Sequence, residues 1–375
     1  MTHSRFCFGS DLLTSNHSID RKDLDIIGAL DELGAKASAK KLSEAVGIPA
    51  RTVRYRLSRL RRIGILRAPE AIPYGRKIGL GEVFVAMDTS RKGTDLLRDV
   101  IESISSFYWS SESYGKYNGY IAQGVYPLTS PSITSTLLRA MQEAGLVSDY
   151  HVFDVVDYEY KHADYRYFSI DSGWTWNWNQ WYDQIERNLN KPARVSPNME
   201  QNTRLVEFDS NDVFLLQQIM KDSEATQKQL ADILGLSETI VNKRLNRLEK
   251  TGVIKGYRSV FTPIGNHGMI VLVLELEEPV ERVLASFYQL PFQLYIMMES
   301  KTRYCIRFSL SSKDHKMFLR GFDLIRPHVV SYFFQTLHSS RTSRPPIPFD
   351  MFDEASGNWE LPLEASLQTI RNANS

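Results

Sequence analysis

The stretch "LSEAVGIPARTVRYRLSRLRRIGIL", residues 42 to 66, returns in altered form as "LADILGLSETIVNKRLNRLEKTGVI", residues 230 to 254. The two stretches align without gaps at an offset of 188 residues, and eight of their 25 positions are identical. The offset is half the length of the 375-residue chain. The sequence therefore predicts two tandem copies of one unit and not a short-period solenoid.

Each copy begins with a helix-turn-helix pattern. Helical periodicity at 23–33 and 211–220 is followed by a short helix that ends at a glycine, Gly47 or Gly235, and in the later copy Thr226 and Gln229 form a capping box. A third helix starts directly after each glycine. A tight glycine-containing turn before this helix is typical of a helix-turn-helix, and "GVIKGYRSVFTP" (252–263) predicts a small β-wing.

The second part of each copy has a sequence pattern that predicts mostly β-strands. In the first copy we expect strands at 82–88, 108–115, 120–126 and 149–160, with helices at 94–104 and 132–145. The second copy repeats this order between residues 269 and 337. The order βαββαβ is that of a ferredoxin-like domain.

The predicted fold class is therefore α+β, a tandem repeat of a winged helix-turn-helix and a ferredoxin-like βαββαβ domain. The expected domains are a first winged helix-turn-helix (19–78), a first ferredoxin-like domain (79–162), an aromatic extension with a linker (163–204), a second winged helix-turn-helix (205–266), a second ferredoxin-like domain (267–339) and a C-terminal extension (340–375).

The third helix of the first copy concentrates positive charge. Residues 51–62, "RTVRYRLSRLRR", hold six arginines and no carboxylate, although the whole chain has a formal net charge of only +1. A helical projection puts Val53, Leu57 and Leu60 on the core face. Because no acidic neighbour accounts for the arginines, we expect this helix to bind double-stranded DNA, with its N-terminal half toward base edges and its C-terminal half toward phosphates.

The expected DNA-binding residues of the first copy are Lys40, Lys41, Arg51, Thr52, Arg54, Tyr55, Ser58, Arg59, Arg61 and Arg62. Those of the second copy are Thr239, Asn242, Lys243, Asn246, Arg247 and Lys250. The arginine that lies nearest the core face, Arg56 or Arg244, is expected to form a structural ion pair, with Asp25 in the first copy and Asp212 in the second.

Composition excludes several other classes. The two cysteines, Cys7 and Cys305, are almost 300 residues apart, which fits neither a disulfide framework nor a zinc site. No apolar run approaches the roughly 20 residues of a membrane helix and no leader is expected, so we predict a cytoplasmic protein. Because catalytic and metal-binding histidine pairs and phosphate-cradling loops are missing, we expect no enzyme activity, cofactor or metal.

The ordered set of motifs resembles the leucine-responsive and asparagine-regulator (Lrp/AsnC) family of prokaryotic transcription regulators. The resemblance rests on residues 230–265, on their partner 42–66, and on the βαββαβ after each. It implies dimerisation through the ferredoxin-like domains, here as a pseudo-dimer within one chain, with further self-association left open. It also implies an effector, often an amino acid, near a Gly-x-Tyr-Asp-like turn, whose closest match is Gly115, Tyr117 and Asn118.

Two alternatives stay open at this point. Siroheme decarboxylases share this architecture, and a similar tetrapyrrole enzyme would need a cavity lined by basic residues and histidines, for which His151, His162, His315 and His328 are candidates. A sensor or scaffold without DNA binding is the other alternative.

The tryptophans at 174, 176, 178 and 181 are expected to pack between the two halves, with the first three on one side of an extended segment. We also expect this segment and the C-terminal extension to fold back onto their own domains.

Overall fold

The computed structural model describes residues 19–89, 94–191, 195, 197–200, 203–261, 267–342 and 344–373. Both halves build a three-helix head. The first head consists of α1 (Arg21–Leu33), α2 (Ala39–Val46) and α3 (Ala50–Arg62), and the second head consists of α7 (Ser210–Lys221), α8 (Gln227–Leu234) and α9 (Glu238–Lys250). Gly47 and Gly235 end α2 and α8 with φ of 66° and 65°, which glycine adopts without strain. The capping box of Thr226 and Gln229 is confirmed.

Each half also builds a ferredoxin-like domain. The first comprises β2 (Leu80–Thr89), α4 (Thr94–Ser103), β3 (Phe107–Gly115), β4 (Gly119–Pro127), α5 (Ile133–Glu143) and β5 (Val147–Val155). The second comprises β10 (Gly268–Leu276), α10 (Glu281–Tyr288), β11 (Leu294–Met298), β12 (Arg303–Leu310), α11 (Ser312–Ile325) and β13 (Val329–Thr342). The strand orders β5-β2-β4-β3 and β13-β10-β12-β11 are equivalent, so the predicted α+β tandem repeat is confirmed.

The two sheets are joined by strands that cross between the halves. β13 pairs with β3 of the first sheet, and β6 (Asp157–Lys161) pairs with β11 of the second. The single strand predicted at 149–160 is therefore wrong, because the chain leaves the first sheet at Val156, whose N–H donates to the Met298 carbonyl at 2.8 Å.

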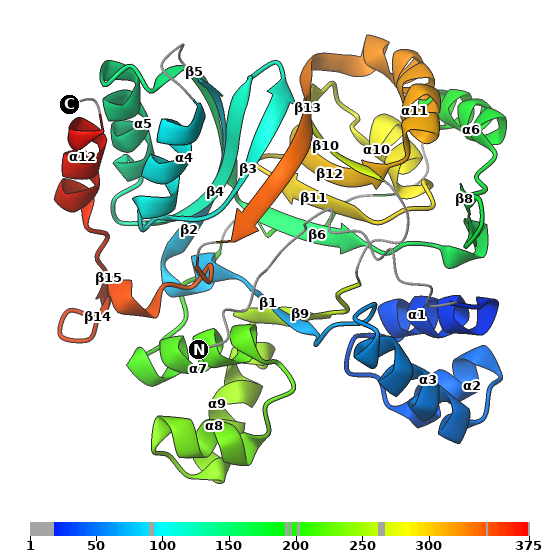
Figure 1. Ribbon diagram of the computed structural model, residues 1–375, viewed down its shortest axis with the longest axis horizontal. Coiled ribbons are helices and arrows are strands. Elements are labelled where there is room, and N and C mark those ends of the chain that lie inside the picture. Colours follow the sequence, from blue (N-terminus) through cyan, green and yellow to red (C-terminus); the bar gives the residue numbers. More distant parts are fainter. Residues whose placement is uncertain are drawn as a thin grey trace.

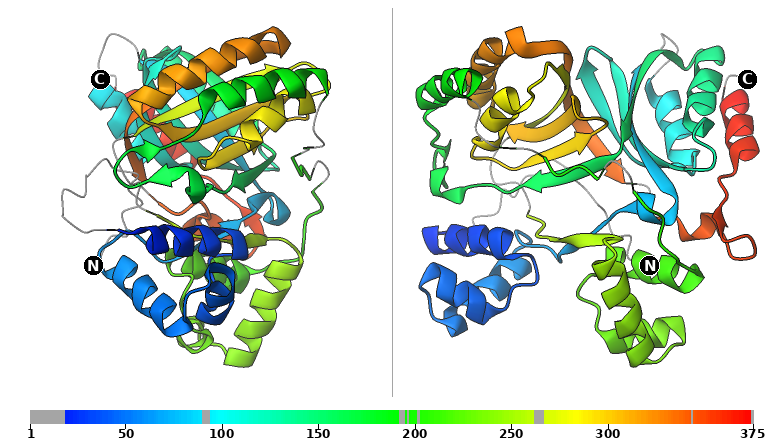
Figure 2. Two further views of the ribbon diagram at one scale, coloured as in Figure 1. Left: turned by 90° about the vertical axis from the view of Figure 1, so that its right-hand side faces the viewer. Right: turned by 180° about the vertical axis from the view of Figure 1, so that it is seen from behind.

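The main interior lies between the sheets, with helices outside. Aromatic and aliphatic side chains of both sheets, among them Phe84, Trp109, Phe153, Val271 and Phe333, form one buried cluster. Helices α4 and α5 cover the first sheet and α10 and α11 cover the second, while both heads lie on one side of this body (Figures 1 and 2).

The wing differs from the expectation. β9 (Ile254–Arg258) does not form a hairpin within its own unit but pairs antiparallel with β1 (Glu70–Pro73) of the first unit, Glu70 lying opposite Arg258. Each unit supplies one strand, so the exposed backbone groups of both are satisfied by the other half. This two-stranded ribbon lies between the heads (Figure 1). Residues 262 and 263 of the predicted wing, and several residues of the segment 163–204 that was expected to contain the linker, lie outside the described residues.

The two extensions also exchange between halves, which contradicts the expected fold-back. After the hairpin β7 (Phe168–Ser169) and β8 (Gly173–Trp174), α6 (Trp178–Asn190) packs against α10 and α11 of the second domain. After β14 (Phe352–Asp353) and β15 (Asn358–Trp359), α12 (Leu363–Asn372) packs against α4 and α5 of the first. Trp178 and Trp181 belong to the helical core of the second domain, and Trp178 begins a helix where an extended segment was predicted.

The second head also packs against the first half of the chain. The core of the second head includes Ile78, Leu80 and Val125 of the first domain.

The structure also contains short 3-10 turns at Gly75–Ile78, Tyr165–Tyr167, Arg326–His328 and Phe349–Met351. Among the described helices, none is long and apolar enough to span a bilayer.

Candidate nucleic-acid interface

The N-terminal half of α3 presents an open basic face. Val53 and Leu60 are fully buried on the side that packs within the head. Arg51, Arg54 and Ser58 are exposed, and Tyr55 keeps 64% of its surface in solvent. The Tyr55 ring is thus surrounded by two arginines and a serine and is mostly open to solvent, so little of it packs against the described residues. This face is the part of the molecule that matches the base-edge surface expected from the sequence.

Two arginines of α3 point the other way. Arg56 Nη1 donates to Asp20 at 2.7 Å and to Asp23 at 2.8 Å, and Arg59 Nη1 donates to Asp23 at 2.9 Å. The Asp23 side chain has no exposed surface. Burial works against the charged form of Arg56, but the hydrogen bonds that it donates to Asp23 and Asp20 raise its pKa.

These contacts correct the expected partner of Arg56 and give Arg59 a partner that was not expected. Arg56 pairs with Asp20 and Asp23, not with Asp25, which instead bonds to Arg21 at 2.9 Å across one helical turn. Arg59 was expected at a phosphate but is held by the buried Asp23 carboxylate, because both side chains lie on the α1 side of α3.

The second head repeats the arrangement. Arg244 Nη1 donates to Asp209 at 2.8 Å and to Asp212 at 2.9 Å, so the pairing of Arg244 with Asp212 is confirmed. Arg247, one of the expected DNA-binding residues, also bonds to Asp212.

In both heads the aspartates form a capping box at the start of the first helix, Asp20 with Asp23 and Asp209 with Asp212. Sequence reasoning identified Asp212 but missed Asp20, Asp23 and Asp209. The Asp-x-x-Asp spacing before each first helix was the available signal, because it recurs with the same offset as the rest of the unit to within one residue.

The outward face of α9 is polar but less basic. Thr239, Asn242, Lys243, Asn246 and Lys250 are all exposed. Asn242 Oδ1 accepts from Gln227 at 2.9 Å and from Asn246 at 3.2 Å, which leaves its amide N–H₂ group pointing away from these donors. The face thus combines amide groups with two ammonium groups.

The heads are in contact with each other. Arg61 Nη2 lies 2.6 Å from Glu224 Oε1 of the second head, with both side chains close to half exposed. The Lys36 ammonium sits 3.4 Å from the centre of the Tyr257 ring. Arg61 therefore serves an inter-head bond, while Arg62, Lys40 and Lys41 are exposed and Thr52 is half-buried.

The turn expected to hold an effector connects β3 and β4 at the junction of the two sheets. Tyr117 is buried, its N–H donates to Gln335 Oε1 at 3.0 Å, and its ring meets Phe333 edge-on. Gly115 allows the close approach, since a Cβ there would lie 2.2 Å from the Phe334 carbonyl oxygen. Asn118 N–H donates to Asp88. The turn therefore belongs to the packing between the two halves.

The four histidines considered for a tetrapyrrole site do not gather. His151 packs against Tyr117 and Phe333, and His162 lies 3.4 Å from Asp31 of the first head. His315 lies on α11 and His328 in the turn before β13. None of the four lines the cavity beside Tyr108 and Trp109 or the cavity beside Phe168 and Trp174.

Comparison with known proteins finds the winged helix-turn-helix DNA-binding family at both heads, over residues 19–67 and 208–255. The chain is 40% identical over 55 residues to the HTH-type transcriptional regulator LrpA of Pyrococcus abyssi, covering 15% of this chain and 39% of the relative. It is 36% identical over 55 residues to the leucine-responsive regulatory protein of Rhizobium meliloti, covering 15% and 35%. The chain thus spans less than half the length of these relatives.

Among solved structures, the siroheme decarboxylase NirDL covers 94% of this chain and 99% of its own at a TM-score of 0.56 and 15% identity. Its complex with an iron-uroporphyrin III analogue covers 88% and 93% at a TM-score of 0.54. At this identity the likeness establishes a shared fold for nearly the whole chain.

Proposed function

Because two Lrp/AsnC-type units follow one another in this chain, we propose that it is a cytoplasmic, sequence-specific regulator of transcription that binds double-stranded DNA through both heads. The observation that carries this proposal is the exposed, carboxylate-free face of α3 in a matched winged helix-turn-helix. The relatives support the same class, as they are named transcriptional regulators.

The side chains divide by position. Arg51, Arg54, Tyr55 and Ser58 are placed to reach base edges in a major groove, where an arginine can donate two hydrogen bonds to guanine. Arg62, Lys40 and Lys41 are the cations suited to phosphates, since their charges face solvent. Arg59 and Arg247 support DNA binding indirectly, by fixing each recognition helix on its head.

The second head would read a different half-site. Its outward face offers Asn242 and Asn246, and an asparagine amide can pair with the edge of adenine. Since arginines occupy or flank the matching positions of the first head, the preferred target has two unlike halves. The pseudo-dimer then binds an asymmetric site with one polypeptide.

Selection from a random duplex library tests this function. The proposal predicts enrichment of one motif with two unlike halves, and variants Arg54→Ala and Asn246→Ala should each relax the sequence preference in one half only. Recovery of unselected sequences, with equal affinity for every duplex, would contradict it.

An enzymatic alternative remains a second candidate because the fold of a siroheme decarboxylase extends over 94% of the chain. The candidate histidines lie on separate elements and line neither of the two cavities described above, which favours the regulator. Incubation with an iron tetrapyrrole tests the alternative directly: a saturable shift in the visible spectrum, followed by loss of a carboxyl group from the pigment, would support the enzyme.

A further inference from the structure

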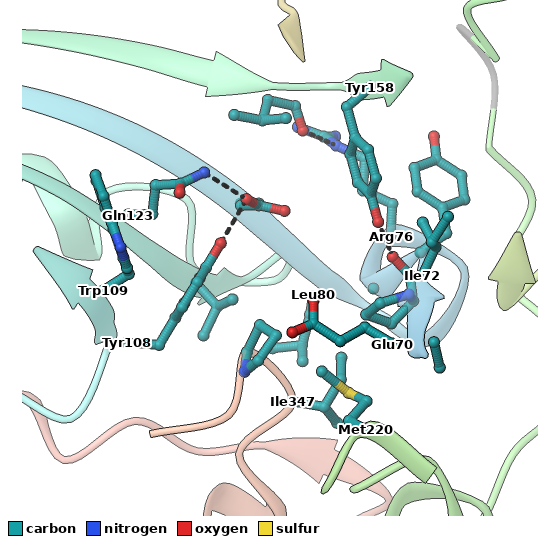
Figure 3. A pocket seen from close by; sticks show the side chains of 18 of the residues that line it. Glu70, Ile72, Arg76, Leu80, Tyr108, Trp109, Gln123, Tyr158, Met220 and Ile347 are labelled. Carbon is teal, nitrogen blue, oxygen red and sulfur yellow. Dashed lines mark hydrogen bonds between the residues drawn. The ribbon is translucent and has the colours of Figure 1, made fainter. Parts of the chain in front are cut away.

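The cavity beside Tyr108 and Trp109 has a volume of about 140 Å³ and lies where the β1–β9 ribbon meets the two sheets. We call it the ribbon cavity. Figure 3 shows Tyr108, Trp109 and Gln123 on one side, Ile72 and Arg76 on another, and Met220 with Ile347 at the base. The ribbon cavity is distinct from the effector-type turn, since Trp109 and Gly115 lie toward opposite ends of β3.

One polar group of the wall has no partner. Trp109 keeps only 5% of its surface exposed, and its indole N–H makes no hydrogen bond with the described residues. A buried donor without an acceptor is costly, so a molecule that brings an acceptor to this point gains from it.

The internal repeat does not account for this indole. Trp109 lies opposite Gln123 in the first sheet as Tyr295 lies opposite Arg307 in the second, so Trp109 and Tyr295 occupy equivalent positions. The fold therefore accepts a phenol ring where the first half places an indole. The unpaired N–H is a property of the ribbon cavity and not a requirement of the repeated unit.

Aromatic rings form much of the wall. Trp109, Tyr158 and Tyr295 are each at least nine-tenths buried. The Arg307 guanidinium packs 5.2 Å from the centre of the Trp109 ring and 4.9 Å from that of Tyr295, which holds these rings in place. A flat aromatic molecule can stack on such rings or meet them edge-on.

Two of the guanidinium groups in the wall are neutralised by carboxylates. Arg76 Nη2 lies 2.5 Å from an oxygen of Asp154, and Arg258 Nε donates to Glu70 at 3.0 Å. An anionic ligand would have to displace a carboxylate side chain from either arginine.

The other two charged side chains, Glu82 and Arg307, belong to one chain of hydrogen bonds. Glu82 accepts from the Tyr108 hydroxyl at 2.7 Å and from the Gln123 amide at 3.3 Å, and the Gln123 oxygen accepts from Arg307 at 3.4 Å. An ion of either sign would lose its hydration here without meeting a free counter-charge. The wall therefore favours an uncharged occupant.

Size limits the occupant to a single ring, because a closed protein cavity of about 150 Å³ is large enough for benzene. We propose that the ribbon cavity binds a small uncharged aromatic molecule that carries a carbonyl or similar acceptor. The ring lies against the aromatic wall, and the acceptor receives the Trp109 indole N–H.

Occupancy would affect the heads. The wall includes Ile72 of β1, Arg258 of β9 and Met220 of α7, which are parts of the ribbon and of the second head. A bound molecule therefore stabilises one position of the second head relative to the sheets. This consequence rests on the proposed DNA binding, but the binding of the small molecule does not.

Calorimetric titration of the full chain with benzamide tests the proposal. Benzoate is the charged analogue of the same shape, and cyclohexanecarboxamide is the non-aromatic one. We expect saturable benzamide binding that is tighter than that of either analogue. Trp109→Phe, which keeps a ring but removes the N–H, should raise the benzamide Kd about fivefold, as expected for a hydrogen bond between uncharged groups.

Trp176→Phe is the matched control, because the Trp176 indole N–H is also buried without a partner but lies outside the ribbon cavity. It should leave the Kd unchanged. If Trp109→Phe unfolds, Ala71→Leu replaces it, since Ala71 lines the cavity and a larger side chain there should weaken benzamide binding by reducing the volume.

Three results would overturn the proposal: no saturable binding at millimolar benzamide, benzoate binding as tight as that of benzamide, or an unchanged Kd in folded Trp109→Phe. DNA binding measured in the same samples keeps such a failure separate from failure of the proposed function.

Discussion

Arg61 on α3 of the first head lies 2.6 Å from Glu224, in the turn between α7 and α8 of the second head, so the two heads are bonded to one another. Near this pair the Ser223 hydroxyl donates to the Pro69 carbonyl of the ribbon segment. An ion pair as exposed as this one contributes at most about 1 kcal/mol. It therefore biases the spacing of the heads without locking it.

Reversing one charge of this pair should broaden the spacing that the protein accepts between half-sites. In Glu224→Arg, two arginines repel each other across the head contact, so duplexes with altered half-site spacing should lose less affinity relative to the optimum than they do with wild type. The exchange Arg61→Glu/Glu224→Arg should restore the wild-type preference. Affinities for a series of spacings check this, and an unchanged profile in the single variant would contradict it.

Because Arg56 pairs with a buried aspartate, it should contribute to the stability of the folded protein. Arg56→Ala leaves the Asp23 carboxylate, which has no exposed surface, with Arg59 as its remaining cation. Removing one partner of a buried ion pair costs several kcal/mol, and with Arg59 still present we expect a loss of about 2–3 kcal/mol. Urea denaturation measures it. Arg62→Ala, on the exposed side, should stay within about 0.5 kcal/mol of wild type.

The substitution Gly321→Ala should destabilise the protein, although replacing glycine by alanine within a helix usually stabilises it. Gly321 lies within α11, where alanine is normally better by about 0.5–1 kcal/mol. A Cβ at this position would lie 2.1 Å from the buried Trp181 ring, so Gly321→Ala should instead destabilise by about 1–3 kcal/mol. Gly28→Ala in α1, where the new Cβ meets only Tyr165 at 3.7 Å, should be neutral or stabilising. Thermal unfolding of both variants distinguishes them.

Acid should loosen the junction between the halves through His151. Burial, together with the charges of Arg303 and Lys116, lowers its pKa from 6.5 to about 4. Between these values the unfolded chain binds more protons than the folded chain, so this contribution to stability falls as the pH drops from 6.5 to 4. His151→Phe should flatten the pH dependence of the unfolding free energy in that window. Equal slopes in the variant and the wild type would refute this role.

The sequence was sufficient for the fold of each unit, because glycine turns, capping residues and alternating strands are local patterns. It also predicted the open face of α3, where Arg51, Arg54 and Tyr55 lie as expected. These features depend on neighbours within one helix or hairpin.

The exchange between the halves was not predictable in this way. Strand β6 continues the chain of β5 with no breaker in the sequence, and only its pairing with β11 shows that it has changed sheets. The same holds for Arg59 and Arg247, which resemble other basic residues of their helices until the buried aspartates of α1 and α7 are located. Such contacts depend on residues more than 30 positions away.

The central claim, that the first recognition helix binds DNA, is tested most directly by fluorescence anisotropy with a labelled duplex across a salt series. Wild type should show log affinity falling linearly with log salt, by about 0.9 per phosphate contacted. Arg51→Ala/Arg54→Ala should bind much more weakly, while Arg139→Ala/Arg326→Ala, which removes the same charge from α5 and the turn after α11, should bind like wild type. Equal binding by both double variants, or no binding by wild type at low salt, would contradict the claim.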